Sequence, residues 1–231
     1  MQFGRWIFLA TAISFLGQQF DRLFLGRVIS TAELGIYSIG LVFSGAIISC
    51  NMQLIRRIGL AALTHTFREN PDDVALRYDK IRRISDIVFM PGLGVLTLLA
   101  PLLIQTLYDS RYWAAGGILQ ILAVAAVIPC ILEPAEACLV AIGKPRWATA
   151  RYALRTITCV TCIPIAWYSG ELQAVLYVLA ACEIPGLIVL WIGLSRIGIF
   201  RPTREFRAFT LYVAVAATTW AVLNPSRILF L

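Results

Sequence analysis

The chain has 231 residues, of which 59% are hydrophobic and only 14% are charged, with a formal net charge of +7 at pH 7. Soluble domains average about 45–50% apolar and about 25% charged residues, so this composition excludes an ordinary soluble domain. Short segments of alternating apolar and polar residues, which are typical of a membrane β-barrel, do not occur. The sequence therefore predicts an all-α fold, a polytopic helical bundle embedded in a lipid bilayer.

Seven apolar segments are candidate membrane spans, because about 20 helical residues cross roughly 30 Å of hydrocarbon. We expect about six to seven transmembrane helices in a single integral membrane domain over 1–231, with spans at 6–25, 33–55, 84–107, 116–142, 148–168, 172–192 and 208–223. The polar segment 56–83 is expected to be a cytoplasmic basic loop. It holds a predicted short amphipathic helix over 58–67 and a break at Asn70-Pro71.

Lysine and arginine are distributed unevenly between the two sides of this topology. Sixteen of the 20 Lys and Arg residues fall at the N-terminus and in the connections on one side, within 56–83, 144–155 and 196–207. Positively charged connections stay in the cytoplasm, so the N-terminus is predicted to be cytoplasmic. The positive charge then faces an anionic leaflet, and no nucleic-acid partner is needed to explain it.

The first span carries a polar stripe on an otherwise apolar helix. On a helix these side chains fall at i, i+3, i+7, i+10 and i+11, which places them on one face: Thr11, Ser14, Gln18, Asp21 and Arg22. Polar side chains inside a membrane are costly unless they face protein or water, so the stripe favours a hydrated cavity that contacts substrate or a coupling ion. The alternative is an interfacial pair, with Arg22 reaching the lipid headgroups and Asp21 in water.

Five further ionisable residues lie in the later spans. Glu133 and Glu136 share one helix face at i, i+3, and Arg151 and Arg155 share another at i, i+4 after a short turn. Antiparallel neighbours would bring the two pairs to a similar depth, as a structural acid–base clamp or as a proton or cation site. Glu183 lies in the middle of its span, where it either pairs with Arg155 or is protonated.

No pattern in the sequence is typical of an enzyme, a cofactor site or a metal centre. Cys159 and Cys162 form a C-x-x-C, but no second pair, histidine or acidic ligand accompanies them. We interpret the cysteines as small residues that pack within apolar helices. The single histidine, His65, lies in the basic segment and is interpreted as a solvated residue.

Three groups of residues resemble the second half of the polysaccharide flippases, which are Wzx-like lipid-linked oligosaccharide transporters of the multidrug/oligosaccharidyl-lipid/polysaccharide exporter superfamily. The first group is Phe3-Gly4-Arg5-Trp6, Asp21-Arg22-Leu23 with Gly26, and Leu34-Gly35-Ile36-Tyr37. The second is LYDSRYWAAGGILQILA at Leu107–Ala123, and the third is the Gly143-Lys144-Pro145 break. Together they cover most of residues 3–155.

The resemblance implies one lobe of a fold in which two pseudo-symmetric helical lobes face each other across a central cavity. Such flippases move an undecaprenyl-diphosphate-linked oligosaccharide from the inner to the outer leaflet by alternating access, with ion or proton antiport as the proposed driving force. The resemblance therefore implies a bacterial inner (plasma) membrane as the location. On this sequence the resemblance makes Arg22 the candidate cation for the diphosphate and Asp21 its partner. Arginine suits that role because its guanidinium forms charge-assisted, bidentate contacts with phosphate.

Seven candidate spans account for only one of the two lobes. The chain is therefore expected to be a piece of a longer protein, or to pair with a missing first lobe or with a second copy of itself. Two other functions stay open, a small-molecule or multidrug exporter of the same superfamily and a non-transport scaffold subunit of a polysaccharide assembly complex.

Overall fold

The computed structural model describes residues 17, 19–168 and 172–223, and the regular structure in these ranges is helical throughout, without a strand. Four stretches are long and apolar enough to cross a membrane: Thr31–Glu69, Pro71–Leu107, Ala115–Ala141 and Leu172–Ser195. The predicted all-α, membrane-embedded class is confirmed at this level. The other expected spans and the total number of spans remain predictions.

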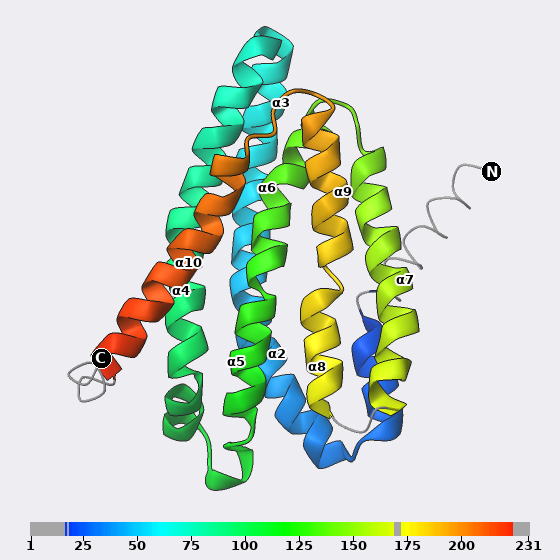
Figure 1. Ribbon diagram of the computed structural model, residues 1–231, viewed down its shortest axis with the longest axis vertical. Helices are drawn as coiled ribbons and strands as arrows, with labels where there is room; N and C mark the ends of the chain where they lie inside the picture. The colour runs from blue at the N-terminus through cyan, green and yellow to red at the C-terminus, as the bar shows by residue number, and fades with distance from the viewer. Residues whose placement is uncertain (1–16, 18, 169–171, 224–231) are drawn as a thin grey trace.

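Figure 1 shows the helices as a bundle of long, mostly upright columns, entered from a short helix over 19–28. The α-helices in chain order are α2 (Thr31–Leu54), α3 (Leu60–Glu69), α4 (Val74–Leu107), α5 (Ala115–Ala125), α6 (Val127–Ala141), α7 (Arg146–Tyr168), α8 (Leu172–Ala181), α9 (Ile184–Ser195) and α10 (Pro202–Leu223). A π-helical turn over Ile55–Gly59 joins α2 to α3, and 3-10 turns at Pro71–Asp73 and Ser110–Tyr112 precede α4 and α5.

The segment 56–83, which we expected to be a loop, is almost entirely helical. Helix α2 continues through the π turn into α3, and the chain reverses at Asn70, where the backbone is extended and Pro71 opens the next turn. The resulting α3–α4 hairpin extends past the other helices at the basic end of the bundle (Figure 1). Most residues between Arg56 and Arg83 are good helix formers and Pro71 is the only proline among them, so polarity alone did not indicate a loop.

Proline interrupts two of the columns. Helix α5 ends at Ala125 and α6 begins two residues later, with Pro129 in its first turn; α8 ends at Ala181 and α9 begins at Ile184, with Pro185 next. Proline has no N–H, so in each column a carbonyl four residues before it loses its helical donor. Because α5 packs on α8 and α6 packs on α9, the two interruptions lie at a similar depth in the bundle.

A third proline, Pro134, lies inside α6 and leaves the Cys130 carbonyl without its helical donor. The side chain of Asn51 on α2 replaces that donor, with its Nδ2 3.0 Å from the Cys130 oxygen. The Oδ1 of Asn51 in turn accepts a hydrogen bond of 2.8 Å from the Ser85 hydroxyl on α4. A fully buried amide therefore ties α2, α4 and α6 together at the proline.

Replacing Asn51 by leucine is expected to lower the free energy of unfolding by about 1–2 kcal/mol, because the Cys130 carbonyl and the Ser85 hydroxyl both lose a buried partner. The measurement is denaturant unfolding of the purified protein in detergent micelles. Ser38→Ala is the matched control, since the Ser38 hydroxyl bonds only the Leu34 carbonyl of its own helix. If the Asn51→Leu protein were as stable as the Ser38→Ala protein, the proposed link of α2, α4 and α6 through Asn51 would be contradicted.

Candidate functional site between two interrupted helices

A polar pocket of about 170 Å³ lies among the helix over 19–28, α2, α7 and the two interrupted columns. Its charged lining residues are Asp21, Arg22, Arg155 and Glu183. Ala125, Ala126 and Pro129 from the α5–α6 interruption line it as well. A water occupies about 30 Å³ in the liquid, so the pocket has room for a small hydrated polar group but not for a sugar chain.

Asp21 is held in the pocket by Tyr37 of α2. The Tyr37 hydroxyl donates to Asp21 Oδ2 at 2.5 Å, and both side chains are buried. A tight turn makes this contact possible, because Ser30 and Glu33 form a capping box that starts α2 directly after the preceding helix. The two helices therefore run antiparallel, and residues on either side of the turn meet.

The pairing of Asp21 with Arg22 that the family resemblance implies stays a prediction. No ion pair joins the two in the part of the chain that the structure describes, and the hydrogen bond of Asp21 goes to Tyr37. Neighbouring residues on a helix point about 100° apart, so their side chains do not face each other. Arg22 is exposed and contributes to the pocket lining without an ion-pair partner among the described residues.

Three members of the predicted stripe, Thr11, Ser14 and Gln18, lie outside the described residues. Their position relative to the pocket remains a prediction, and only Asp21 and Arg22 of the stripe are placed in its lining.

Glu183 has the partner that the sequence offered as one of two alternatives. Arg155 Nε on α7 lies 2.6 Å from Glu183 Oε1 at the α8–α9 interruption. Arg151, one turn before Arg155, contacts the same carboxylate at 3.9 Å through Nη2. The structure therefore brings Arg151 and Arg155 of α7 to the acid in the middle of the neighbouring column.

Arg151 also contacts the acid pair on α6. Its Nη1 lies 3.6 Å from Glu133 Oε1 and forms a charged hydrogen bond with Glu136. The Tyr152 hydroxyl donates to Glu136 Oε1 at 3.2 Å. Gly186 of α9 makes room for this arginine, since a Cβ there would lie 2.9 Å from the Arg151 Cγ.

A second pocket of about 230 Å³ lies beside the same acids and is lined in part by Arg56, Glu133 and Glu136. Arg56 belongs to the π-helical turn, and such turns inside α-helices occur often at functional sites. Arg151 and Glu183 connect the two pockets through a continuous series of ion pairs. A change of charge in one pocket would therefore change the electrostatic potential in the other.

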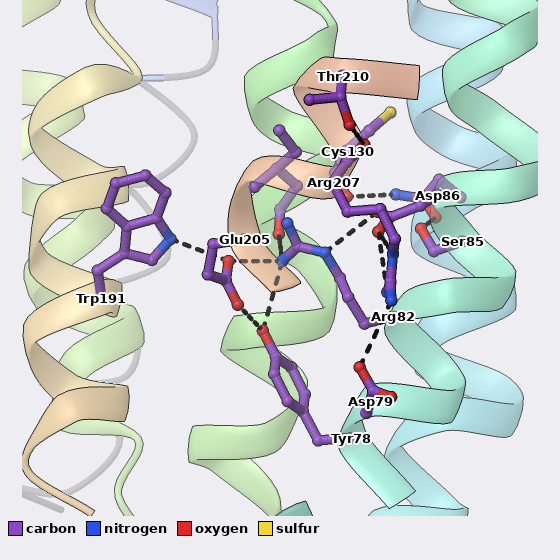
Figure 2. A network of polar contacts seen from close by, with 12 residues as sticks. Tyr78, Asp79, Arg82, Ser85, Asp86, Cys130, Trp191, Glu205, Arg207 and Thr210 are labelled. Atoms are coloured by element: carbon purple, nitrogen blue, oxygen red, sulfur yellow. Dashed lines mark hydrogen bonds and ion pairs between the residues drawn. The ribbon is translucent and has the colours of Figure 1, made fainter. Parts of the chain in front are cut away.

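A separate buried network, which the sequence analysis missed, ties α10 to the core near the basic end (Figure 2). Arg82 on α4 has no exposed side-chain surface; its Nη1 lies 2.9 Å from Glu205 Oε2 and its Nε lies 3.1 Å from Asp86 Oδ1. The Nη1 also donates to the Ile131 carbonyl of α6 at 3.1 Å.

Aromatic donors complete the coordination of Glu205. The Tyr78 hydroxyl donates to its Oε1 at 2.8 Å, and Trp191 Nε1 of α9 donates to its Oε2 at 3.0 Å. Arg207 pairs with Asp86 at 3.3 Å and with Asp79 at 3.6 Å. Every labelled carboxylate in Figure 2 faces an arginine, so the network acts as a structural joint between α4, α6, α9 and α10.

The sequence did contain a signal for this network. Tyr78, Arg82 and Asp86 are spaced at i, i+4 and i+8, which places an aromatic hydroxyl, a cation and an acid on one face of a helix. Their partners on α10, Glu205 and Arg207, are more than a hundred residues away along the chain, and no local pattern connects them.

Fold and pocket define a membrane-embedded helical protein with a charged internal site. The model of a protein family described as "polysaccharide biosynthesis protein" matches residues 1–116. This is half of the chain and includes Asp21, Arg22 and Tyr37, so the chain belongs to the polysaccharide biosynthesis protein family. Comparison with curated proteins and with solved structures gives no match.

Proposed function

We propose that the chain is one lobe of a Wzx-like transporter that moves an undecaprenyl-diphosphate-linked oligosaccharide across a bacterial inner membrane for surface polysaccharide biosynthesis. The observation that carries the proposal is the charged pocket between two interrupted helices, in a chain of the polysaccharide biosynthesis family. Irregular backbone at membrane depth is tolerated where it lines a cavity, and transporters place substrate sites at such interruptions.

The chemistry of the pocket suits a diphosphate group. Arg22 has no ion-pair partner within 19–168 and 172–223, so it can make charge-assisted contacts, and Arg155 lies across the same pocket. Helices α6 and α9 both begin at the interruptions, so their N-terminal ends add partial positive charge at that depth. The pocket has room for the charged headgroup, and the glycan would lie outside it against a second lobe, supplied by another polypeptide or a second copy.

The distribution of basic residues supports the orientation in this proposal. The α3–α4 hairpin, the α6–α7 turn and the α9–α10 connection lie at the same end of the bundle (Figure 1). These connections hold most of the lysines and arginines, so this end faces the cytoplasm in our proposal, and the cytoplasmic N-terminus stays a prediction from the sequence.

Replacing Arg22 by glutamine tests the proposed role of the pocket. We expect surface polysaccharide to fall by about tenfold or more and the lipid-linked precursor to accumulate, because a hydrogen bond to a charged group contributes about 1.5–3 kcal/mol. The measurement is quantitative lectin or antibody binding to cells that carry the variant at the chromosomal locus, with a blot that confirms an unchanged protein level.

Arg111→Gln is the matched control, since Arg111 is exposed in the α4–α5 turn and its ion pair in the described part of the chain is with the exposed Asp109. Normal surface polysaccharide in the Arg22→Gln strain would overturn the proposed site. If surface polysaccharide stayed normal while drug sensitivity rose, the small-molecule exporter would replace the glycan transporter as the proposed function. Normal surface polysaccharide together with normal drug sensitivity would favour the scaffold subunit.

A further inference from the structure

Two buried thiols from different helices meet beside the pocket. The Sγ atoms of Cys159 on α7 and Cys182 at the α8–α9 interruption lie 3.1 Å apart, in hydrogen-bond contact. Cys182 also donates to the Leu179 carbonyl at 3.2 Å, so its thiol is oriented toward the interruption. Cys162, the other cysteine of the C-x-x-C, is only half-buried, and among the described residues the Cys159 thiol contacts Cys182 instead.

The thiol pair and the Arg155–Glu183 ion pair are adjacent cross-connections between the same two elements. Cys159 follows Arg155 by four residues and shares its face of α7, and Cys182 immediately precedes Glu183. Arg155 and Glu183 line the pocket, so the thiols lie directly behind its wall.

We propose that Cys159 and Cys182 are a redox-sensitive pair whose disulfide fixes α7 to the α8–α9 interruption and immobilises this wall of the pocket. A disulfide has an S–S length of about 2.0 Å, so the sulfurs need to approach by only about 1 Å. The reaction breaks two S–H bonds and forms one S–S bond. Both electrons and both protons pass to a two-electron oxidant that dissolves in the membrane, of the quinone class.

The proposed disulfide changes how α8 and α9 can move relative to each other. Half-helices such as α8 and α9 can tilt against each other where the backbone ladder is broken, and the ion pair to Arg155 can open and close as they do. A covalent bond one residue before Glu183 removes that freedom. The reduced protein is the mobile form, and the oxidised protein is the locked form.

Thiol counting after oxidation tests the pair without relying on transport. Membranes that contain the full chain are treated with diamide, denatured and labelled with a polyethylene-glycol maleimide that shifts the gel band once per free cysteine. The chain has six cysteines, and we expect two fewer labels after diamide, with full recovery on dithiothreitol. Peptide mass spectrometry should identify the Cys159–Cys182 cross-link.

Cys162→Ser is the matched control, because it removes the other cysteine of the C-x-x-C and should leave the loss of two labels intact. Cys159→Ser and Cys182→Ser should each abolish it. If diamide causes no loss of label, or if Cys162→Ser abolishes the loss, the pairing is overturned.

The locking effect has its own measurement, which distinguishes it from the proposed transport function. Diamide should raise the thermal unfolding temperature of the wild-type protein in detergent and leave that of Cys159→Ser unchanged, since a cross-link between the two helices restricts the unfolded chain. An oxidised protein with the cross-link but an unchanged unfolding temperature would overturn the lock. A raised and an unchanged unfolding temperature can each be interpreted whether or not the chain transports a glycan.

Discussion

Replacing Arg82 by methionine is expected to lower the free energy of unfolding by about 3–5 kcal/mol, because it leaves the carboxylates of Glu205 and Asp86 buried without their central cation. Methionine fills much of the same volume, so the loss reflects charge more than packing. The measurement is denaturant unfolding in detergent, with the amount of folded protein in membranes as a second readout.

The neighbouring residue offers a matched control for this prediction. The Arg83 side chain is 61% exposed and forms an ion pair with Asp79 at 3.4 Å. Exposed pairs contribute about 0–1 kcal/mol, so Arg83→Met should have little effect. Equal losses for the two adjacent arginines would show that the buried network does not hold α10 in place.

Replacing Arg151 by methionine is the second change with a large expected effect. Arg151 contacts Glu133, Glu136 and Glu183, and after the substitution only Arg155 remains within ion-pair distance of any of these acids among the described residues. Removing the partner of buried charges costs about 3–5 kcal/mol. We expect most of the protein to be lost from membranes, as measured by fluorescence-detected size exclusion of detergent extracts.

A second substitution should partly reverse that loss. Adding Glu136→Gln to Arg151→Met removes one uncompensated charge, so the double variant should accumulate to a higher level than Arg151→Met alone. Arg146→Gln is the control, since Arg146 is exposed in the first turn of the same helix. A double variant as depleted as the single one would contradict an electrostatic origin.

The acid–base cluster around Arg151 was predictable because its geometry is local. The i, i+3 spacing of Glu133 and Glu136, the i, i+4 spacing of Arg151 and Arg155, and one short turn are enough to bring the groups to one depth. The contact between Glu183 and Arg155 was one of two stated alternatives, since sequence alone does not give the rotation of a third helix.

The joint around Arg82 and the thiol pair were beyond the reach of local patterns. Interpreting 56–83 as a loop removed Arg82 from the set of buried residues, although its helical spacing to Asp86 was visible. Cys159 meets Cys182 rather than Cys162 because packing of α7 on the interrupted column decides which thiol faces inward. Both depend on contacts between distant helices, which only the three-dimensional arrangement supplies.

Transport of the lipid-linked glycan through the pocket that Arg22 lines can be tested directly in membrane vesicles. Inside-out inner-membrane vesicles are supplied with radiolabelled lipid-linked oligosaccharide made in their outer leaflet, and the fraction protected from an added membrane-impermeant glycosidase is followed with time. We expect the protected fraction of glycan to rise with time in vesicles with the wild-type chain. It should stay near background in vesicles with Arg22→Gln or without the chain. Equal protection in all three would contradict transport through this pocket.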